Sequence, residues 1–102
     1  MTAPQTSQTE QVWLMPLFTP KPGSESELRA DLEALQRLSR KDEGCIEYSV
    51  YAFDERFVLI EGWESQTDLD SHNEKDHVRE FVDSSTDLLA EPFTVVRITP
   101  VG

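Results

Sequence analysis

Two neighbouring segments rich in strand-forming residues constrain the fold of this chain most. Alternating side chains run over residues 45–53, and a second strand pattern runs over residues 57–63. Only Asp54-Glu55-Arg56 separates them, a connection as short as those that join antiparallel neighbours. The pair therefore predicts a β-hairpin.

A further strand pattern lies near each end of the chain, over residues 12–19 and residues 93–99. Pro16 interrupts the first of these. Because proline has no N–H to donate to a neighbouring strand, it is confined to edge strands and bulges. We therefore expect the first strand to lie at a sheet edge or to carry a bulge at Pro16.

The segment between the first strand and the hairpin has the pattern of an amphipathic helix. Leucines recur at helical spacing up to about residue 40. Ser24 and Glu27 stand in the spacing of a capping box, and Gly44 marks the exit from the helical region. One helix is therefore predicted from Ser24 to about residue 40.

The region after the hairpin predicts a second helical part, broken into two pieces. Ser65 and Asp68 form another capping-box pattern and open a short helix. Asp76 is the predicted cap of the next piece, which Pro92 ends. The order of elements is then β-α-β-β-α-β.

This order predicts an α+β, ferredoxin-like fold with a four-stranded antiparallel sheet and helices on one face. Apolar residues occur on both parities of the strands, whereas helices would cover only one face. A homodimer packed through the sheet faces is the economical cover for the other. The two sets are Tyr51, Phe53 and Phe57 on one parity and Tyr48, Val50 and Val58 on the other.

The net charge and the cysteine content of the chain indicate which partners and which cellular compartment to expect. The chain has 102 residues, with 20 acidic and 9 basic side chains and a formal charge of −11. This charge repels phosphate backbones and anionic lipid, so we expect no nucleic-acid partner and no membrane partner. The single cysteine, Cys45, favours the reducing cytoplasm. We predict a disordered tail over residues 1–10 and one domain over residues 11–102.

Several motifs together resemble a known family. They are Lys21-Pro22-Gly23, the sequence EGCIEY over residues 43–48, the sequence FVLIEGW over residues 57–63, and the pair His72 and His77. In this order and spacing they resemble the antibiotic biosynthesis monooxygenase family, particularly its quinol-monooxygenase-like members. The resemblance implies a dimeric α+β barrel, in which two ferredoxin-like subunits pack their sheets face to face. It also implies oxidation of a quinol or a polyphenolic or polycyclic aromatic by molecular oxygen, without a cofactor.

His72 is the predicted general base, and it matches a histidine of the family. Histidine titrates near neutral pH and suits removal of a phenolic proton. The resulting anion is electron-rich and can itself reduce oxygen. Glu61 or His77 is the predicted polar assistant. The structural alternatives are a histidine that only bonds a carbonyl at a helix end and a glutamate paired with a nearby cation.

The residues predicted to contact the substrate are mainly aromatic. Trp63 has the same strand parity as Glu61, and the resemblance places this Glu-x-Trp pair at the edge of the substrate cavity. Trp63 would form an aromatic wall, unless it only packs in the core. Tyr48 and Phe81 are further candidates for the cavity lining, and Asn73 is a candidate for orienting a substrate oxygen.

No metal site and no other cofactor is predicted. The two histidines are five residues apart, a spacing that does not place them on one face of a single helix. Residues 12–19 contain no asparagine, which argues against the haem-degrading members of the same fold. Two alternative functions remain open: an isomerase that uses the same histidine without oxygen, and a non-catalytic small-ligand-binding or stress-response dimer.

Overall fold

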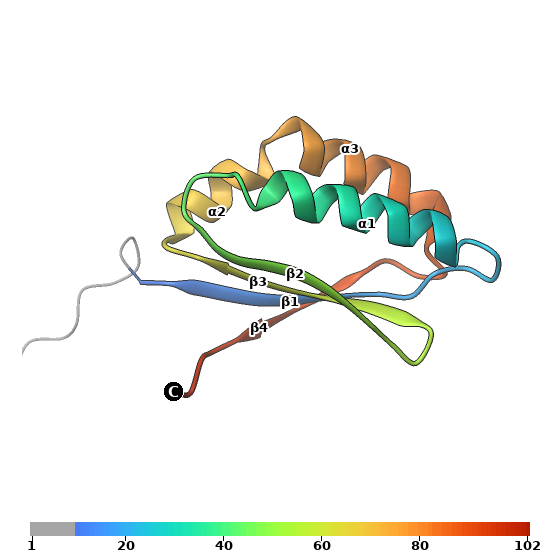
Figure 1. Ribbon diagram of the computed structural model, residues 1–102, viewed down its shortest axis with the longest axis horizontal. Coiled ribbons are helices and arrows are strands. Elements are labelled where there is room, and N and C mark those ends of the chain that lie inside the picture. Colours follow the sequence, from blue (N-terminus) through green and yellow to red (C-terminus); the bar gives the residue numbers. More distant parts are fainter. Residues whose placement is uncertain (1–9) are drawn as a thin grey trace, which may run out of the picture.

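The computed structural model describes residues 10–102 and has two layers, a four-stranded antiparallel sheet with helices on one of its faces (Figure 1). The predicted tail lies outside the described residues except for Glu10. The elements are β1 (Val12–Phe18), α1 (Glu25–Ser39), β2 (Cys45–Phe53), β3 (Arg56–Trp63), α2 (Gln66–Asn73), α3 (Asp76–Ser85), the 3-10 turn η1 (Thr86–Leu88) and β4 (Thr94–Ile98).

The strand order β2-β3-β1-β4 confirms the ferredoxin-like topology. The hairpin closes more tightly than the sequence indicates, because its turn has two residues rather than three. Asp54 and Glu55 both adopt positive φ angles, 47° and 59°, as in the type I′ turns that match the twist of antiparallel strands. As a result β3 begins at Arg56.

The prediction that Pro16 marks an edge strand is wrong. β1 lies between β3 and β4, and Pro16 pairs with Val95 of β4 without a shift in register. Towards β3, the paired positions stop at Leu14 and resume at Leu17, so the proline falls in a gap of that ladder. A central strand tolerates the missing N–H there because no partner on β3 requires it.

The helix starts follow the predicted caps only in part. Ser65 caps α2 as expected, since its Oγ accepts a hydrogen bond from the Asp68 amide at 3.1 Å. Ser24 precedes α1, but its side chain makes no capping hydrogen bond, so that predicted capping box is wrong. Lys75, rather than Asp76, is the cap residue of α3, because the backbone is still extended at Lys75.

One prediction about the sheet faces is also wrong. Phe57 was expected on the same face as Tyr51 and Phe53, but it pairs with Ala52 and lies under the helices, 1% exposed. The two-residue turn causes this difference, because it sets Phe53 opposite Arg56 rather than Phe57. The expectation that Tyr48 and Tyr51 lie on opposite faces agrees with the register.

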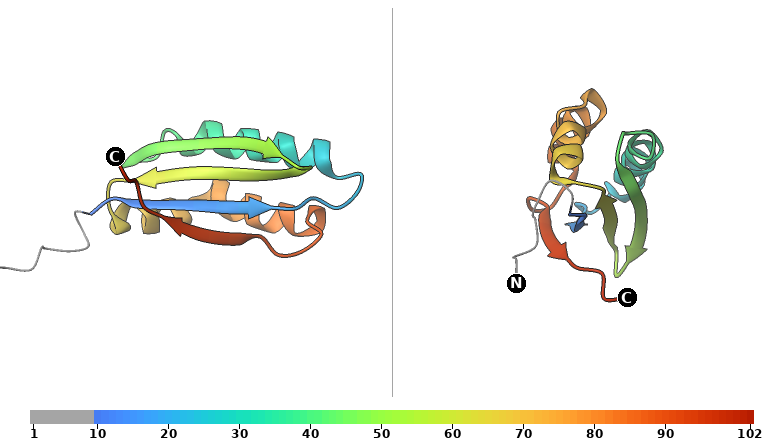
Figure 2. Two further views of the ribbon diagram at one scale, coloured as in Figure 1. Left: turned by 90° about the horizontal axis from the view of Figure 1, so that it is seen from below. Right: turned by 90° about the vertical axis from the view of Figure 1, so that its left-hand side faces the viewer.

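The sheet face turned away from the helices is not covered by any helix of the described chain (Figure 2, left). It is mostly apolar, and its polar members are Glu47, Ser49, Arg56 and Thr94. The strand register places on it Trp13, Met15, Leu17, Tyr51, Phe53, Val58, Ile60, Val96 and Ile98. We call these residues the outer face. Among residues 10–102, none of the helices has the length and apolar character needed to cross a membrane.

Candidate functional site

A cavity of about 240 Å³ lies between the inner face of the sheet and the helices. Four of its lining residues are polar and come from three elements: Tyr48 on β2, Glu61 on β3, and His72 and Asn73 on α2. The rest of the wall is apolar and consists of Leu14, Pro16, Phe18, Leu35, Leu59, Val78, Phe81, Val82, Phe93 and Val95. Such a cavity suits a largely apolar small molecule with a few oxygens.

His72 is joined to a carboxylate that the sequence did not single out. Its Nδ1 lies 2.8 Å from Oδ2 of Asp42, and Nε2 of His77 lies 2.9 Å from the same oxygen. The three residues come from the loop after α1, from α2 and from α3. Five-residue spacing would separate the two histidines on a single helix, but they belong to two different helices. The chain leaves the helical path between α2 and α3, which lets both histidines point at Asp42.

These contacts define the protonation of His72. Burial lowers the pKa of His72, and the hydrogen bond and charge of Asp42 only partly oppose this. The imidazole is therefore neutral at pH 7. Because a carboxylate accepts a hydrogen bond, Nδ1 carries the proton and Nε2 carries the lone pair. Among the described residues, Nε2 has no hydrogen-bond partner, so it remains available as a base.

Trp63 supports this arrangement from behind. Its ring packs on the His72 ring with centroids 4.4 Å apart, and its Nε1 donates a hydrogen bond to Oε1 of Glu61 at 2.8 Å. The side chain is completely buried and is not part of the cavity wall. Trp63 thus holds His72 and Glu61 in place, whereas the sequence predicted it as the wall itself.

Glu61 and Tyr48 are shifted towards their neutral forms. Burial raises the pKa of Glu61, and the hydrogen bond from Trp63 partly offsets this. Burial, followed by the charge of Glu61, also raises the pKa of Tyr48. The Tyr48 ring meets His72 edge to face, with centroids 5.4 Å apart. The cavity therefore holds a base whose pKa is lowered beside a carboxyl group whose pKa is raised.

The loop that carries Asp42 is fixed on both sides. Arg40 donates a hydrogen bond from Nε to the backbone oxygen of Tyr48 at 2.7 Å, and the Glu64 amide donates to the Gly44 oxygen at 2.8 Å. Gly44 has a φ of +82°, and a Cβ at this position would overlap the side chain of Asp68 on α2. Glycine is therefore required where the loop passes α2.

The structure brings most of the predicted site residues together. Tyr48, Glu61, His72, Asn73 and Phe81 line the cavity. His77 does not line it, and lies instead in a shallow hollow between α1 and α3, connected to His72 through Asp42. Asp42 is the residue that sequence reasoning missed. Its only signal was its place just before the glycine turn, which is faint among 20 acidic residues.

The same cluster is the place where a metal ion could be held. The ligand atoms of Asp42, His72 and His77 all lie within 4.8 Å of one another. In the structure both histidine nitrogens are hydrogen-bonded to the Asp42 oxygen, an arrangement that fully accounts for their closeness. The expectation that the protein uses no metal stays a prediction.

Comparisons with known proteins identify one family of monooxygenases. The family model described as antibiotic biosynthesis monooxygenase matches residues 12–84. A protein of Mycobacterium tuberculosis named "Putative monooxygenase Rv0793" is 32% identical over 95 residues, which cover 91% of this chain and 94% of that protein. The solved structure of Rv0793 superposes with a TM-score of 0.86 at 29% identity, and covers 91% of this chain and 97% of that one.

Two further relatives are similar in sequence. "Putative monooxygenase YcnE" of Bacillus subtilis is 31% identical over 80 residues, 76% of this chain and 84% of YcnE. The uncharacterized protein sll1783 of Synechocystis is 37% identical over 75 residues. The alignment covers 71% of this chain but only 51% of sll1783, so the chain spans about half the length of that relative.

Proposed function

Because the chain belongs to the antibiotic biosynthesis monooxygenase family, we propose that it is a cofactor-independent monooxygenase of a quinol or a polyphenolic or polycyclic aromatic small molecule. The observation that carries this proposal is the neutral His72, oriented by Asp42 and set in the wall of an apolar cavity. A base in such a cavity can ionise a phenol away from water, where the anion is most reactive.

The reaction starts with proton transfer. Nε2 of His72 takes the proton of a quinol hydroxyl, and the adjacent ring carbon of the quinolate forms a bond to molecular oxygen. The imidazolium returns the proton to the resulting peroxide. Loss of the ring C–H proton then breaks the O–O bond and releases water. One oxygen atom stays on the ring, and the substrate supplies all four electrons, so no cofactor is needed.

The other cavity residues have roles that follow from their positions. Glu61, whose raised pKa favours the protonated form, is placed to donate a hydrogen bond or a proton to the peroxide. Tyr48 and Asn73 can orient substrate oxygens, and Phe81 packs against the ring. His77 is 19% exposed and contacts the same Asp42 oxygen as His72, so it helps to hold the carboxylate in place.

The test is oxygen consumption with a panel of reduced naphthols and hydroquinones, in the presence of a chelator. We expect uptake of one oxygen molecule per product molecule, with a single ¹⁸O atom incorporated from ¹⁸O₂. The His72→Gln variant should lose this activity while it keeps its circular dichroism spectrum. Failure of every panel member to react faster than in buffer would contradict the oxygenase assignment.

A second candidate function is an isomerase that acts on an enolisable carbonyl compound. The observation that favours it is the pair of opposite shifts in one cavity, a base with a lowered pKa and an acid with a raised pKa. Such a pair can remove a proton at one carbon and deliver it at another. Turnover under strictly anaerobic conditions, or solvent deuterium incorporation without oxygen uptake, would favour the isomerase.

We also propose that the protein acts as a homodimer in the cytoplasm. The apolar outer face supports the dimer, because a continuous apolar sheet surface of this kind is typical of a protein interface. A free cysteine supports a reducing compartment. Burial raises the pKa of the Cys45 thiol to about 11, so this cysteine is unreactive at neutral pH.

A further inference from the structure

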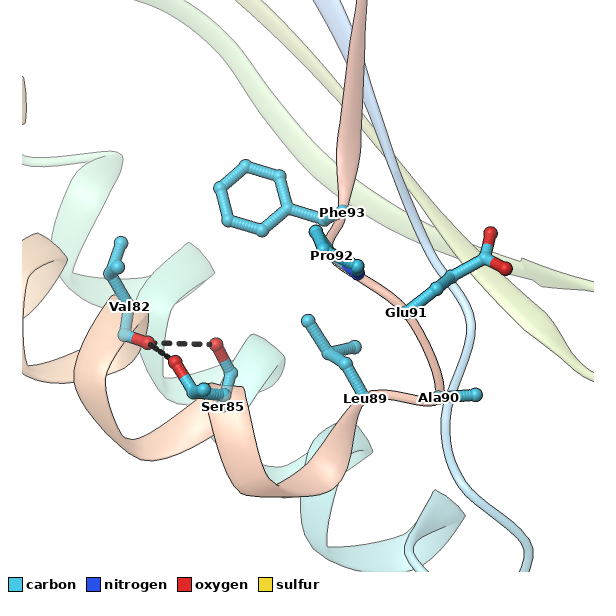
Figure 3. Close-up of a pocket in the computed structure, with 8 residues that line it drawn as sticks. Val82, Ser85, Leu89, Ala90, Glu91, Pro92 and Phe93 are labelled. Atoms are coloured by element: carbon cyan, nitrogen blue, oxygen red, sulfur yellow. Dashed lines mark hydrogen bonds between the residues drawn. The ribbon is translucent and has the colours of Figure 1, made fainter.

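A second cavity lies beside the first. It has a volume of about 340 Å³ and is formed where α3 passes through η1 into the start of β4 (Figure 3). Two of its wall residues, Val82 and Phe93, also line the cavity that contains His72. The two cavities are therefore neighbours separated by these two side chains. We call the second one the outer pocket.

The outer pocket offers apolar contacts and few polar ones. The hydroxyls of Ser85 and Thr86 both donate to the backbone oxygen of Val82, at 3.3 and 2.9 Å, so their hydrogen atoms are already used. Figure 3 shows the Glu91 carboxylate directed away from Val82 and Leu89. A ligand in this pocket would gain free energy mainly by burying hydrocarbon.

The pocket is held open by the fold. The Ala90 amide donates to the Thr19 oxygen at 2.8 Å, and the Lys21 amide donates to the Leu88 oxygen at 2.8 Å. These bonds fix the segment after η1 to the loop that follows β1. Because the pocket is already formed, little free energy is spent on ordering its side chains when a ligand binds.

The partition between the cavities is also anchored. The Phe93 ring packs on the Phe18 ring with centroids 5.1 Å apart. Phe18 in turn meets Phe81 edge to face at 5.7 Å. Phe93 therefore keeps a fixed place between the two cavities, beside the half-exposed Val82.

The volumes of the two cavities suggest that one ligand occupies both. Sites for small molecules usually have volumes of about 300–1,000 Å³. The cavity at His72, at about 240 Å³, is below this range, whereas the addition of its neighbour brings the combined space well within it. A substrate larger than a small ring system must extend beyond the first cavity, and the outer pocket adjoins it.

We propose that the outer pocket is a second subsite of the same ligand site, and that it binds an alkyl substituent carried by the aromatic ring held near His72. This inference rests on the proposed function, because it assumes an aromatic ring in the first cavity. It narrows the substrate class to phenols or quinols with a hydrocarbon side chain.

The experiment is a binding series with resorcinol, 4-butylresorcinol and 4-hexylresorcinol, measured by isothermal titration calorimetry without oxygen, so that no turnover interferes. In the native protein we expect resorcinol to bind weakly and the dissociation constant to fall by up to about fourfold for each buried methylene. Ala90→Phe adds a large ring at an exposed residue of the outer pocket's wall. Ala30→Phe, at an alanine of α1 that is also exposed and lies outside both cavities, is the matched control.

Ala90→Phe should abolish the gain with chain length and leave the affinity for resorcinol unchanged, while Ala30→Phe should behave like the native protein. Val82→Trp, at a position shared by the two cavities, should block the passage and also abolish the gain with chain length. If resorcinol binds but chain length has no effect in the native protein, the subsite proposal is wrong and the aromatic site stands. If the gain survives in Ala90→Phe and Val82→Trp, the chain binds elsewhere, for example on the outer face, and the proposal is also wrong. If no member binds, both proposals fail.

Discussion

The two faces of the sheet are made by the same strands but have different surroundings. On β3, Leu59, Glu61 and Trp63 face the helices and are buried, whereas Val58 and Ile60 alternate with them and lie on the outer face. The inner face combines its apolar residues with the polar groups of the cavity. The outer face is apolar, and no helix within residues 10–102 covers it. We therefore propose that one face supports chemistry and that the other supports association with a second copy of the chain.

The largest expected effect concerns the inner face. His72→Gln removes the base but keeps a polar side chain of similar size, so we expect kcat to fall by about 100- to 10,000-fold. Steady-state oxygen uptake measures this loss, with light scattering as a check on assembly. If activity falls but the dimer also dissociates, the two faces are not independent, and the comparison breaks down.

The next effect concerns the outer face. Val58 pairs with Leu17 on one side and Tyr51 on the other, near the middle of the apolar surface. A carboxylate buried there would cost roughly 3 kcal/mol or more, so Val58→Asp should weaken the dimer by at least about 100-fold. Sedimentation velocity measures the change. Val101→Asp, a fully exposed valine beyond β4, is the matched control. A monomeric native protein at micromolar concentration would contradict the dimer proposal.

A similar but smaller effect is expected for the residue that positions the base. Asp42→Asn keeps the shape but no longer selects the tautomer of His72, and we expect kcat to fall about 100-fold. Asp70→Asn on α2 replaces an exposed aspartate and should have no effect. Activity in the Asp42→Asn variant equal to that of the control would show that Asp42 does not orient the base.

The Asp42→Asn variant should also change the pH dependence of the activity. The base works only when neutral, and burial lowers the pKa of His72 from its ordinary 6.5, so the acidic limb of kcat/KM, which reports the free enzyme, should lie below pH 6.5. Asp42 raises this pKa, so its replacement should move the limb to still lower pH. A merely structural role for Asp42 would lower kcat without moving the limb.

The smallest effect concerns the turn that decides which residue lies on which face. Glu55 adopts a φ of 59°, a left-handed conformation that costs a non-glycine residue about 1 kcal/mol. Glu55→Gly should relieve this and increase the free energy of unfolding by up to about 1 kcal/mol. Denaturant unfolding measures it, with Glu43→Gly, next to the glycine at residue 44, as a contrasting variant that should not stabilise. A destabilised Glu55→Gly variant would contradict the type I′ assignment.

Much of the fold could be predicted because its signals are local. Alternation over Cys45–Phe53, the serine cap at Ser65 and the order of helices and strands each depend on residues a few positions apart. The face of Phe57 could not be predicted with the same certainty, since one residue more or less in the turn reverses the parity of the whole strand. The prediction of an edge strand from Pro16 was wrong for a related reason. The proline is tolerated in the central strand β1 because the pairing with β3 has a gap there, and that gap depends on a strand that lies far away in the sequence.

The sequence by itself determined the order of the elements, the apolar character of both sheet faces and the identity of His72 as a candidate base. Only the tertiary structure decided that Asp42 meets His72 and His77, which lie 30 and 35 residues away. It also decided that Trp63 lies behind the cavity, that the pKa of Glu61 is raised and that the pKa of His72 is lowered. The physical reason is that burial and charge depend on what surrounds a side chain in space. Patterns of neighbouring residues reveal local structure, but they do not reveal that environment.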